Sequence, residues 1–199
     1  MQLDTLNKEQ KSILIGSILG DAYLQTTGKQ NARLRFEQGA KQKDYLFWKV
    51  DKFSNLFNGE PKYIKRKHPI SNNSYEYWRH QSYSTKEFGK WQKIFYSNKK
   101  KIIPLNLEKL LDPISLAVWY MDDGYCYKRD KVSYIYLGKV LKEEAVITQD
   151  AILKNFQIKS KVLDKKNKGF AIYFSRIESE KLHNLIRKFI LPSFYYKLS

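Results

Sequence analysis

Leu14-Ile-Gly-Ser-Ile-Leu-Gly-Asp-Ala22 is an apolar stretch whose pattern returns later in the chain as Leu116-Ala-Val-Trp-Tyr-Met-Asp-Asp-Gly124. Each copy has helical character, ends in an acidic residue and continues as aromatic, strand-like sequence. Asp21 and Asp123 hold the same place in the two copies. The repeat therefore predicts that the chain is a duplication organised around two short helices.

An acidic residue is unexpected at this place in a helix. The C-terminal end of a helix carries partial negative charge, so Lys, Arg or Gly is the usual residue there. A solvated surface aspartate is the alternative for either residue taken alone. Two acids at matched positions indicate a cation that binds carboxylate and carbonyl oxygens. Mg²⁺ is such a cation, because it is commonly held by one or two carboxylates together with phosphates and water.

The composition indicates a polyanionic partner. The 199 residues include 37 Lys and Arg against 20 Asp and Glu, a formal net charge of +17. An anionic membrane surface is the alternative, but the basic residues are spread along the chain among aromatic ones, which favours nucleic acid. The single cysteine, Cys126, excludes an intramolecular disulfide and a cysteine-based zinc site, and fits a reducing compartment. No apolar segment is long enough to span a bilayer, and the first residues show no targeting pattern, so we expect a soluble protein.

Both halves are predicted to follow the order α-β-β-α-β-β-α. The first contains helices over 7–20, 44–57 and 86–96, with strands over 23–27, 33–38, 63–67 and 75–83. The second contains a helix that begins at Asp112-Pro113, helices over 142–155 and 178–191, and strands over 125–128, 132–137, 158–163 and 170–175. The predicted domains are a first half-domain over 1–96, a linker over 97–111 and a second half-domain over 112–199.

The strand over 33–38 shows which side of the sheet could bind DNA. Leu34 and Phe36 point to one face, whereas Arg33, Arg35 and Glu37 point to the other. A solvated sheet face is the alternative, but two-stranded ribbons fit the major groove, where base pairs are distinguishable. The predicted DNA-contacting residues are Arg33, Arg35, Glu37, Lys65, Lys67 and Arg79 in the first half, and Lys128, Lys159, Lys161 and Tyr173 in the second. Contact with phosphates alone is the alternative for each lysine.

The two motif copies resemble the LAGLIDADG motif, and the chain resembles a two-motif LAGLIDADG homing endonuclease over nearly its whole length. The resemblance extends to Lys101 before Pro104 and to the closing Tyr195-Tyr196-Lys197-Leu198. It implies an α+β fold with two pseudo-two-fold halves, each with a four-stranded antiparallel sheet that binds DNA. It also implies that the motif helices pack closely, with the two acids above the minor groove. Gly16 and Gly20 match Val118 and Asp122, so this helix interface should be asymmetric.

The resemblance further implies the site residues. Asp21 and Asp123 would bind the metal through their carboxylates, and Gly20 and Asp122 through their main-chain carbonyls. Mg²⁺ would be the cofactor, with Mn²⁺ able to substitute. The catalytic residues would be Asp21 and Asp123 together with Lys101 and Lys197, which would orient water and stabilise charge. The alternatives are a linker charge for Lys101 and a frayed chain end for Lys197.

The function implied is that of a monomeric endonuclease that hydrolyses double-stranded DNA at a long specific site and leaves short 3′ overhangs. Such an enzyme promotes the mobility of the intron that encodes it. The Lys-, Asn-, Ile- and Tyr-rich composition is typical of an A+T-rich genome and fits a mitochondrion, a plastid or a bacterial cytoplasm. One alternative is an RNA maturase that assists group I intron splicing. The other is a non-cleaving DNA-binding module, which would be expected to have lost one motif acid.

Overall fold

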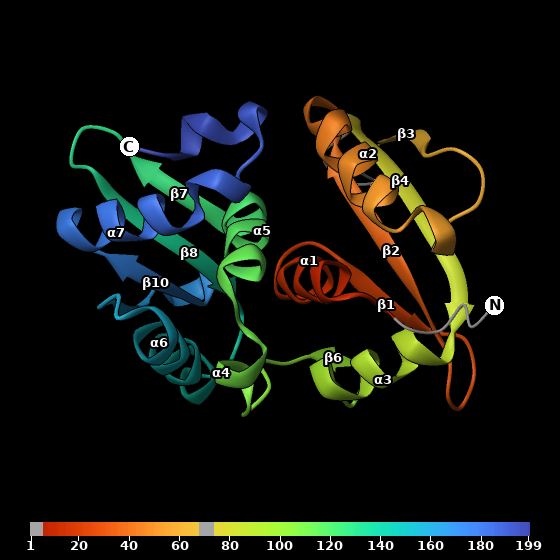
Figure 1. The fold of residues 1–199 in the computed structure, drawn as a ribbon, viewed down its shortest axis with the longest axis horizontal. Helices are drawn as coiled ribbons and strands as arrows, with labels where there is room; N and C mark the ends of the chain where they lie inside the picture. The colour runs from red at the N-terminus through yellow and green to blue at the C-terminus, as the bar shows by residue number, and fades with distance from the viewer. Residues whose placement is uncertain (1–5, 68–73) are drawn as a thin grey trace. The chain divides into compact units, whose positions relative to one another are not determined.

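The computed structural model describes residues 6–67 and 74–199, and these form two compact units. Unit 1 comprises the chain up to Gln10 together with Asp21–Ile94, and unit 2 comprises Lys11–Gly20 together with Phe95–Ser199. The first motif helix, α1 (Lys8–Leu19), therefore belongs mainly to unit 2. Unit 2 thus contains both motif helices, because the second is α5 (Pro113–Asp123) (Figure 1).

Unit 1 is an antiparallel four-stranded sheet covered by helices. Its elements are β1 (Tyr23–Thr26), β2 (Ala32–Gly39), α2 (Lys43–Lys52), β3 (Lys62–Lys67), β4 (Ser74–Thr85) and α3 (Lys86–Phe95), and the strand order is β1-β2-β4-β3. In Figure 1, α2 lies along the face of β2 and β4. Leu34 and Phe36 are buried on that face, as the alternating sequence of β2 predicts.

Unit 2 contains a second sheet with the same topology. Besides α1 and α5 it comprises β5 (Tyr96–Ser97), β6 (Lys100–Lys101), α4 (Leu107–Leu110), β7 (Gly124–Tyr127), β8 (Val132–Gly138), α6 (Lys142–Phe156), β9 (Lys161–Asp164), β10 (Phe170–Phe174) and α7 (Arg176–Ile186). The strand order β7-β8-β10-β9 repeats that of unit 1, and neighbouring strands are again antiparallel. The predicted α+β class with two four-stranded antiparallel sheets is confirmed.

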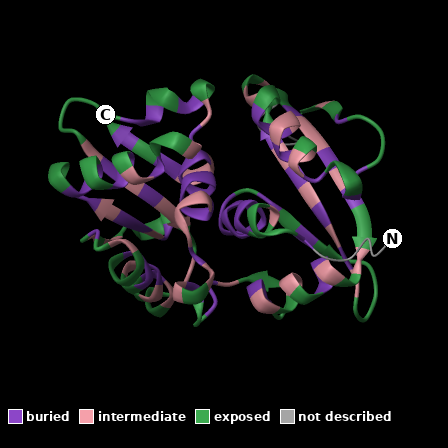
Figure 2. Ribbon diagram, in the orientation of Figure 1, coloured by how far each residue is buried: buried purple, intermediate pink, exposed green. Residues whose placement is uncertain are grey.

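Each motif helix is buried along most of its length, over residues 12–19 of α1 and 115–121 of α5 (Figure 2). A helix that is apolar all round belongs in a protein interior. The second begins with a capping box in which the backbone N–H of Ser115 donates to the carboxylate of Asp112 over 2.8 Å, with Pro113 in the first turn. The start predicted from the Asp112-Pro113 pair is therefore correct.

Several element boundaries differ from the prediction for local reasons. Residues 97–101 form part of a hairpin, β5–β6, whose turn residues Asn98 and Lys99 have φ of 48° and 64°. Gln157 ends α6 in the left-handed conformation with φ of 57°, and strand β9 begins only at Lys161. Helix α2 ends at Lys52 rather than continuing to residue 57.

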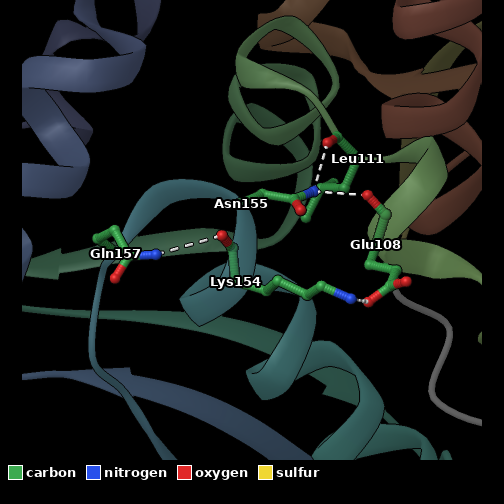
Figure 3. Close-up of polar contacts among 5 residues, drawn as sticks. All are labelled: Glu108, Leu111, Lys154, Asn155 and Gln157. Carbon is green, nitrogen blue, oxygen red and sulfur yellow. Dashed lines mark hydrogen bonds and ion pairs between the residues drawn. The ribbon is translucent and has the colours of Figure 1, made fainter.

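Helix α4, which follows this hairpin, is attached to α6 by polar contacts (Figure 3). The side-chain amide of Asn155 donates to the carbonyl oxygens of Glu108 and Leu111 over 2.7 and 2.8 Å. Lys154 forms an ion pair with the Glu108 carboxylate, and the Gln157 amide donates to the Lys154 carbonyl over 3.4 Å. Asn155 thus satisfies carbonyl groups that a four-residue helix leaves without intrahelical partners.

Candidate functional site

The motif helices approach each other closely at two glycines. A Cβ atom on Gly16 would lie 2.3 Å from the carbonyl oxygen of Ser115 and 2.8 Å from Cβ of Val118. A Cβ atom on Gly20 would lie 2.5 Å from Cβ of Asp122. Each glycine thus faces a larger residue of the other helix, which confirms the predicted asymmetry. The contact places the ends of both helices beside each other within unit 2.

The first motif acid, Asp21, follows Gly20 just after the end of α1 at Leu19. Asp21 is exposed and accepts a hydrogen bond of 3.4 Å from Nε2 of Gln38 in β2. It lines an open cavity of about 560 Å³ whose wall also includes Arg35, Glu37 and Arg66. The second motif acid, Asp123, is the last residue of α5 and is half-buried. Both acids therefore stand at helix C-terminal ends.

Each predicted catalytic lysine donates to the carbonyl that precedes a motif acid. Nζ of Lys101 donates to the Gly20 carbonyl over 2.6 Å. Nζ of Lys197 donates to the carbonyls of Met121 and Asp122 over 2.7 and 3.2 Å. An ammonium suits these positions, because the last carbonyls of a helix lack intrahelical partners and lie at the negative end of the helix dipole. The structure therefore brings each lysine to a predicted carbonyl ligand, Lys101 to Gly20 and Lys197 to Asp122.

The donor atoms at these helix ends fit a hard divalent cation. The carboxylates and the carbonyls of Gly20 and Asp122 offer oxygen alone, and a carbonyl that accepts one hydrogen bond keeps a second lone pair. Among residues 6–67 and 74–199, no group of three or more His, Cys, Asp or Glu side chains could hold a metal by itself. Mg²⁺ needs no such group, because phosphates and water commonly complete its coordination.

Gln38 is a site residue that the sequence analysis missed. Its side chain is 3% exposed on the core-facing side of β2, and its amide contacts Asp21. Glutamine is seldom so buried. The sequence signal for this residue was that Gln38 falls on the same face of the strand as Leu34 and Phe36. The matching position in β8, one residue before its final glycine, is Leu137. The second half thus has an apolar residue where the first has Gln38.

Four of the predicted DNA-contacting residues share one face of the first sheet. Arg79 donates to the Glu37 carboxylate over 2.7 Å, and the two residues are cross-strand partners. Arg33 donates to Gln81 over 3.3 Å, and the guanidinium of Arg35 lies 5.1 Å from the ring centre of Tyr23. Guanidinium and carboxylate groups can pair with base edges, so this face has the chemistry of a groove reader.

The lysines predicted on β3 point the other way. Lys62 pairs with Arg79 in the register, so Lys62, Ile64 and Arg66 share the face of Arg79, whereas Lys65 and Lys67 alternate to the opposite face. Nζ of Lys65 is engaged with Glu76 at 2.8 Å. Arg66 instead lines the cavity beside Asp21.

The corresponding face of the second sheet is rich in tyrosine. The ring contacts link Tyr125, Tyr127, Tyr134, Tyr136 and Tyr173 with centroid distances between 4.7 and 6.0 Å. Burial raises the pKa of Tyr136 to about 12, so its hydroxyl stays protonated at neutral pH. Of the predicted residues, Lys161 is the cross-strand partner of Tyr173 and belongs to this face. Lys159 is exposed just before β9, and Lys128 donates to the Leu198 carbonyl.

No helix in the described part of the chain is long and apolar enough to cross a membrane.

Comparison with known proteins identifies the family of the chain. The profile of the LAGLIDADG DNA endonuclease family matches residues 11–182. The "probable intron-encoded endonuclease 1" of Wickerhamomyces canadensis is 32% identical over 99% of this chain and 87% of its own length. The cytochrome b mRNA maturase bI2 of Debaryomyces hansenii is 27% identical over 97% of this chain and 74% of its own.

Solved structures give the same result. The homing endonuclease I-WcaI bound to its DNA recognition sequence matches with a TM-score of 0.90 and 32% identity, over 98% of this chain and 88% of that one. A variant of I-DmoI in complex with its target DNA in the presence of Mg shares the fold, with a TM-score of 0.52 and 16% identity over 91% of this chain and 98% of that one. The chain belongs to the LAGLIDADG DNA endonuclease family.

Proposed function

We propose that this protein is a homing-type endonuclease that binds a long double-stranded DNA site as a monomer and hydrolyses one phosphodiester in each strand. The observation that carries the proposal is the matched pair of contacts in which Lys101 and Lys197 donate to Gly20 and Asp122, one residue before Asp21 and Asp123. Duplicated machinery suits duplex DNA, whose backbone is approximately two-fold symmetric. The half-domains over 1–96 and 112–199, joined by 97–111, would each serve one half-site.

In this proposal the site residues have three different roles. Asp21, Asp123 and the carbonyls of Gly20 and Asp122 would hold Mg²⁺ or Mn²⁺, which supplies charge stabilisation and an activated water when bound. Lys101 and Lys197 are fixed by their helix-end carbonyls, so their ammonium charge is preorganised where negative charge develops. The sheet faces would read base edges in the major groove, with Arg33, Arg35, Glu37 and Arg79 in the first half.

The biological role proposed is mobility of an intron that encodes the protein, with short 3′ overhangs as the product. The similarity to a protein called an intron-encoded endonuclease supports this role. The composition favours an A+T-rich host genome in a mitochondrion, a plastid or a bacterium.

RNA maturase activity is a second candidate, because the maturase bI2 of Debaryomyces hansenii is 27% identical over 97% of this chain. The intact acids Asp21 and Asp123 favour DNA cleavage, since RNA binding alone would not need them. A DNA-binding module without cleavage activity would likewise not need both motif acids.

The experiment is incubation with duplex DNA that carries the joined exons flanking the encoding intron. We expect double-strand breaks in Mg²⁺, none in EDTA, and none with Asp21→Asn or Asp123→Asn. Retained binding by the two variants, measured by gel shift, would assign the loss to chemistry. Tight binding by the wild type without a cut in Mg²⁺ or Mn²⁺ would reject the endonuclease and leave the maturase, which is tested by splicing of the intron RNA.

A further inference from the structure

Lys197 is an unusually buried lysine. Its side chain is 9% exposed, its Nζ contacts the carbonyls of Met121 and Asp122, and it lies 5.5 Å from the ring centre of Phe194. A buried ammonium is stable only where partners replace its lost hydration. Its position therefore depends on how firmly the Lys197–Ser199 segment is held.

Three side chains fix the backbone of that segment. The hydroxyl of Tyr120 donates to the Lys197 carbonyl over 2.8 Å, and Lys128 donates to the Leu198 carbonyl. The backbone N–H of Ser199 donates to Nδ1 of His183 over 3.0 Å. The three anchoring side chains come from α5, from the turn after β7 and from α7.

Two of these anchors belong to one buried network. Nε2 of His183 lies 3.0 Å from the hydroxyls of both Tyr120 and Ser133. Because Nδ1 accepts from Ser199, the neutral imidazole carries its proton on Nε2 and donates it to a hydroxyl. Tyr120 and Ser133 are fully buried, and His183 is 1% exposed. A satisfied polar network of this kind fixes a single arrangement.

The duplicated half shows that the fold does not require this network. Tyr120 occupies the place of Ile18 in the motif. Ser133 pairs with Cys126 in the register as Leu34 pairs with Leu24, so it occupies the place of Leu34. Ile18 and Leu34 are both 0% exposed. At two equivalent core positions the first half therefore has apolar residues and the second has hydroxyls.

Lys101 is held in another way. It ends the β5–β6 hairpin, where it pairs with Tyr96 across a two-residue turn. Its position is thus set by backbone pairing, whereas that of Lys197 is set by buried side chains.

We propose that Tyr120 and His183 are positioning residues for Lys197, so that one of the two strand cuts depends on this buried network and the other does not. The inference rests on the proposed function and adds that each of the two lysines serves the cleavage of one strand. Tyr120 and His183 act through the Lys197–Ser199 segment and need not touch DNA.

The test measures the cleavage rate of each strand separately, with duplex DNA labelled at the 5′ end of one strand or the other and enzyme in excess. The variants are Tyr120→Phe and His183→Gln, with Lys197→Met and Lys101→Met to assign a strand to each lysine. Ile152→Val is the control for lost stability, because Ile152 is fully buried on α6 and is not a member of the hydrogen-bonded network.

We expect Tyr120→Phe and His183→Gln to slow the strand assigned to Lys197 by about tenfold or more and to change the other by less than about twofold. Nicked duplex would then accumulate, while DNA affinity and the Ile152→Val rates stay near wild type. Equal slowing of both strands, slowing of the strand assigned to Lys101, or no slowing of either would overturn the proposal.

A second measurement is independent of cleavage. Amide hydrogen exchange of Ser199, followed by NMR in the free protein, should be faster in both variants than in the wild type and in Ile152→Val. Unchanged exchange would reject the anchoring role whether or not the protein cuts DNA. A wild type that cuts neither strand but shows the expected exchange would reject the endonuclease and keep the anchoring of the segment.

Discussion

Nζ of Lys101 donates a 2.6 Å hydrogen bond to the carbonyl oxygen of Gly20, the residue before the first motif acid. The bond joins the end of a short hairpin to the end of a buried helix. A charged donor on such a carbonyl makes a short, strong hydrogen bond. The bond holds the Lys101 ammonium at the residue that precedes Asp21. The hairpin therefore brings a positive charge to a defined place that a flexible linker could not hold.

Lys101→Met should slow cleavage of one strand by about a hundredfold and leave DNA affinity within a few-fold of wild type. The reason is that a preorganised positive group can contribute a few kcal/mol to the transition state while adding little to ground-state binding. Single-turnover cleavage and gel shift measure the two quantities. Lys100→Met, at the exposed neighbouring position of β6, is the control and should cut at nearly the wild-type rate. Equal losses in the two variants would show that only net charge matters.

Gly16→Ala should destabilise the protein by about 1–3 kcal/mol, the usual cost of overpacking. The added Cβ would lie 2.3 Å from the backbone oxygen of Ser115, which cannot move without shifting α5. Gly28→Ala is the matched control, because nothing lies within 4 Å of its Cβ. Urea denaturation gives both free energies of unfolding. Similar stabilities for the two variants would contradict the close helix packing.

Arg66→Ala should weaken binding of the target duplex more than Lys65→Ala does. The two neighbours point to opposite faces of β3, and only Arg66 lines the cavity beside Asp21. The expected losses are about tenfold for Arg66→Ala, as for a lost base or phosphate contact, and less than about threefold for Lys65→Ala. Fluorescence anisotropy at fixed salt measures both. The reverse order would place the DNA on the other face of this strand.

Much of this arrangement can be read from the sequence. The repeated motif predicts that both acids stand at helix ends, since matched positions in a duplication must be explained together. The alternation in β2 predicts that the side chains of Arg33, Arg35 and Glu37 face away from the core, and the structure confirms this orientation.

The remaining features depend on contacts that no local pattern contains. Strand β3 is basic on both faces, so periodicity could not distinguish Lys65 from Arg66. The turn at Asn98 and Lys99 lacks the glycine that usually marks a hairpin with positive φ. Lys128 donates to the carbonyl of Leu198, a residue 70 positions later. This contact follows from tertiary packing and not from a local pattern.

The stability of the protein should fall as the pH drops from 7 to 5, in part because of His183. Burial, together with the nearby charges of Arg187 and Lys128, lowers the pKa of His183 to about 4. In the unfolded chain the pKa of histidine is about 6.5. Between these values the unfolded state binds more protons, so the free energy of unfolding decreases with falling pH. The contribution of this histidine should be about 2 kcal/mol between pH 7 and pH 5.

Urea denaturation of the wild type and of His183→Gln at pH 5, 6 and 7 measures this contribution. The variant cannot gain a proton, so the difference between the two proteins should shrink by about 2 kcal/mol as the pH falls from 7 to 5. His80→Gln is the control, because His80 lies in unit 1, where burial lowers its pKa but a backbone hydrogen bond to Gly59 opposes the shift. Its effect should depend less on pH. Parallel curves for the wild type and His183→Gln would mean that His183 titrates equally in the folded and unfolded states, and that the network around it is open to water.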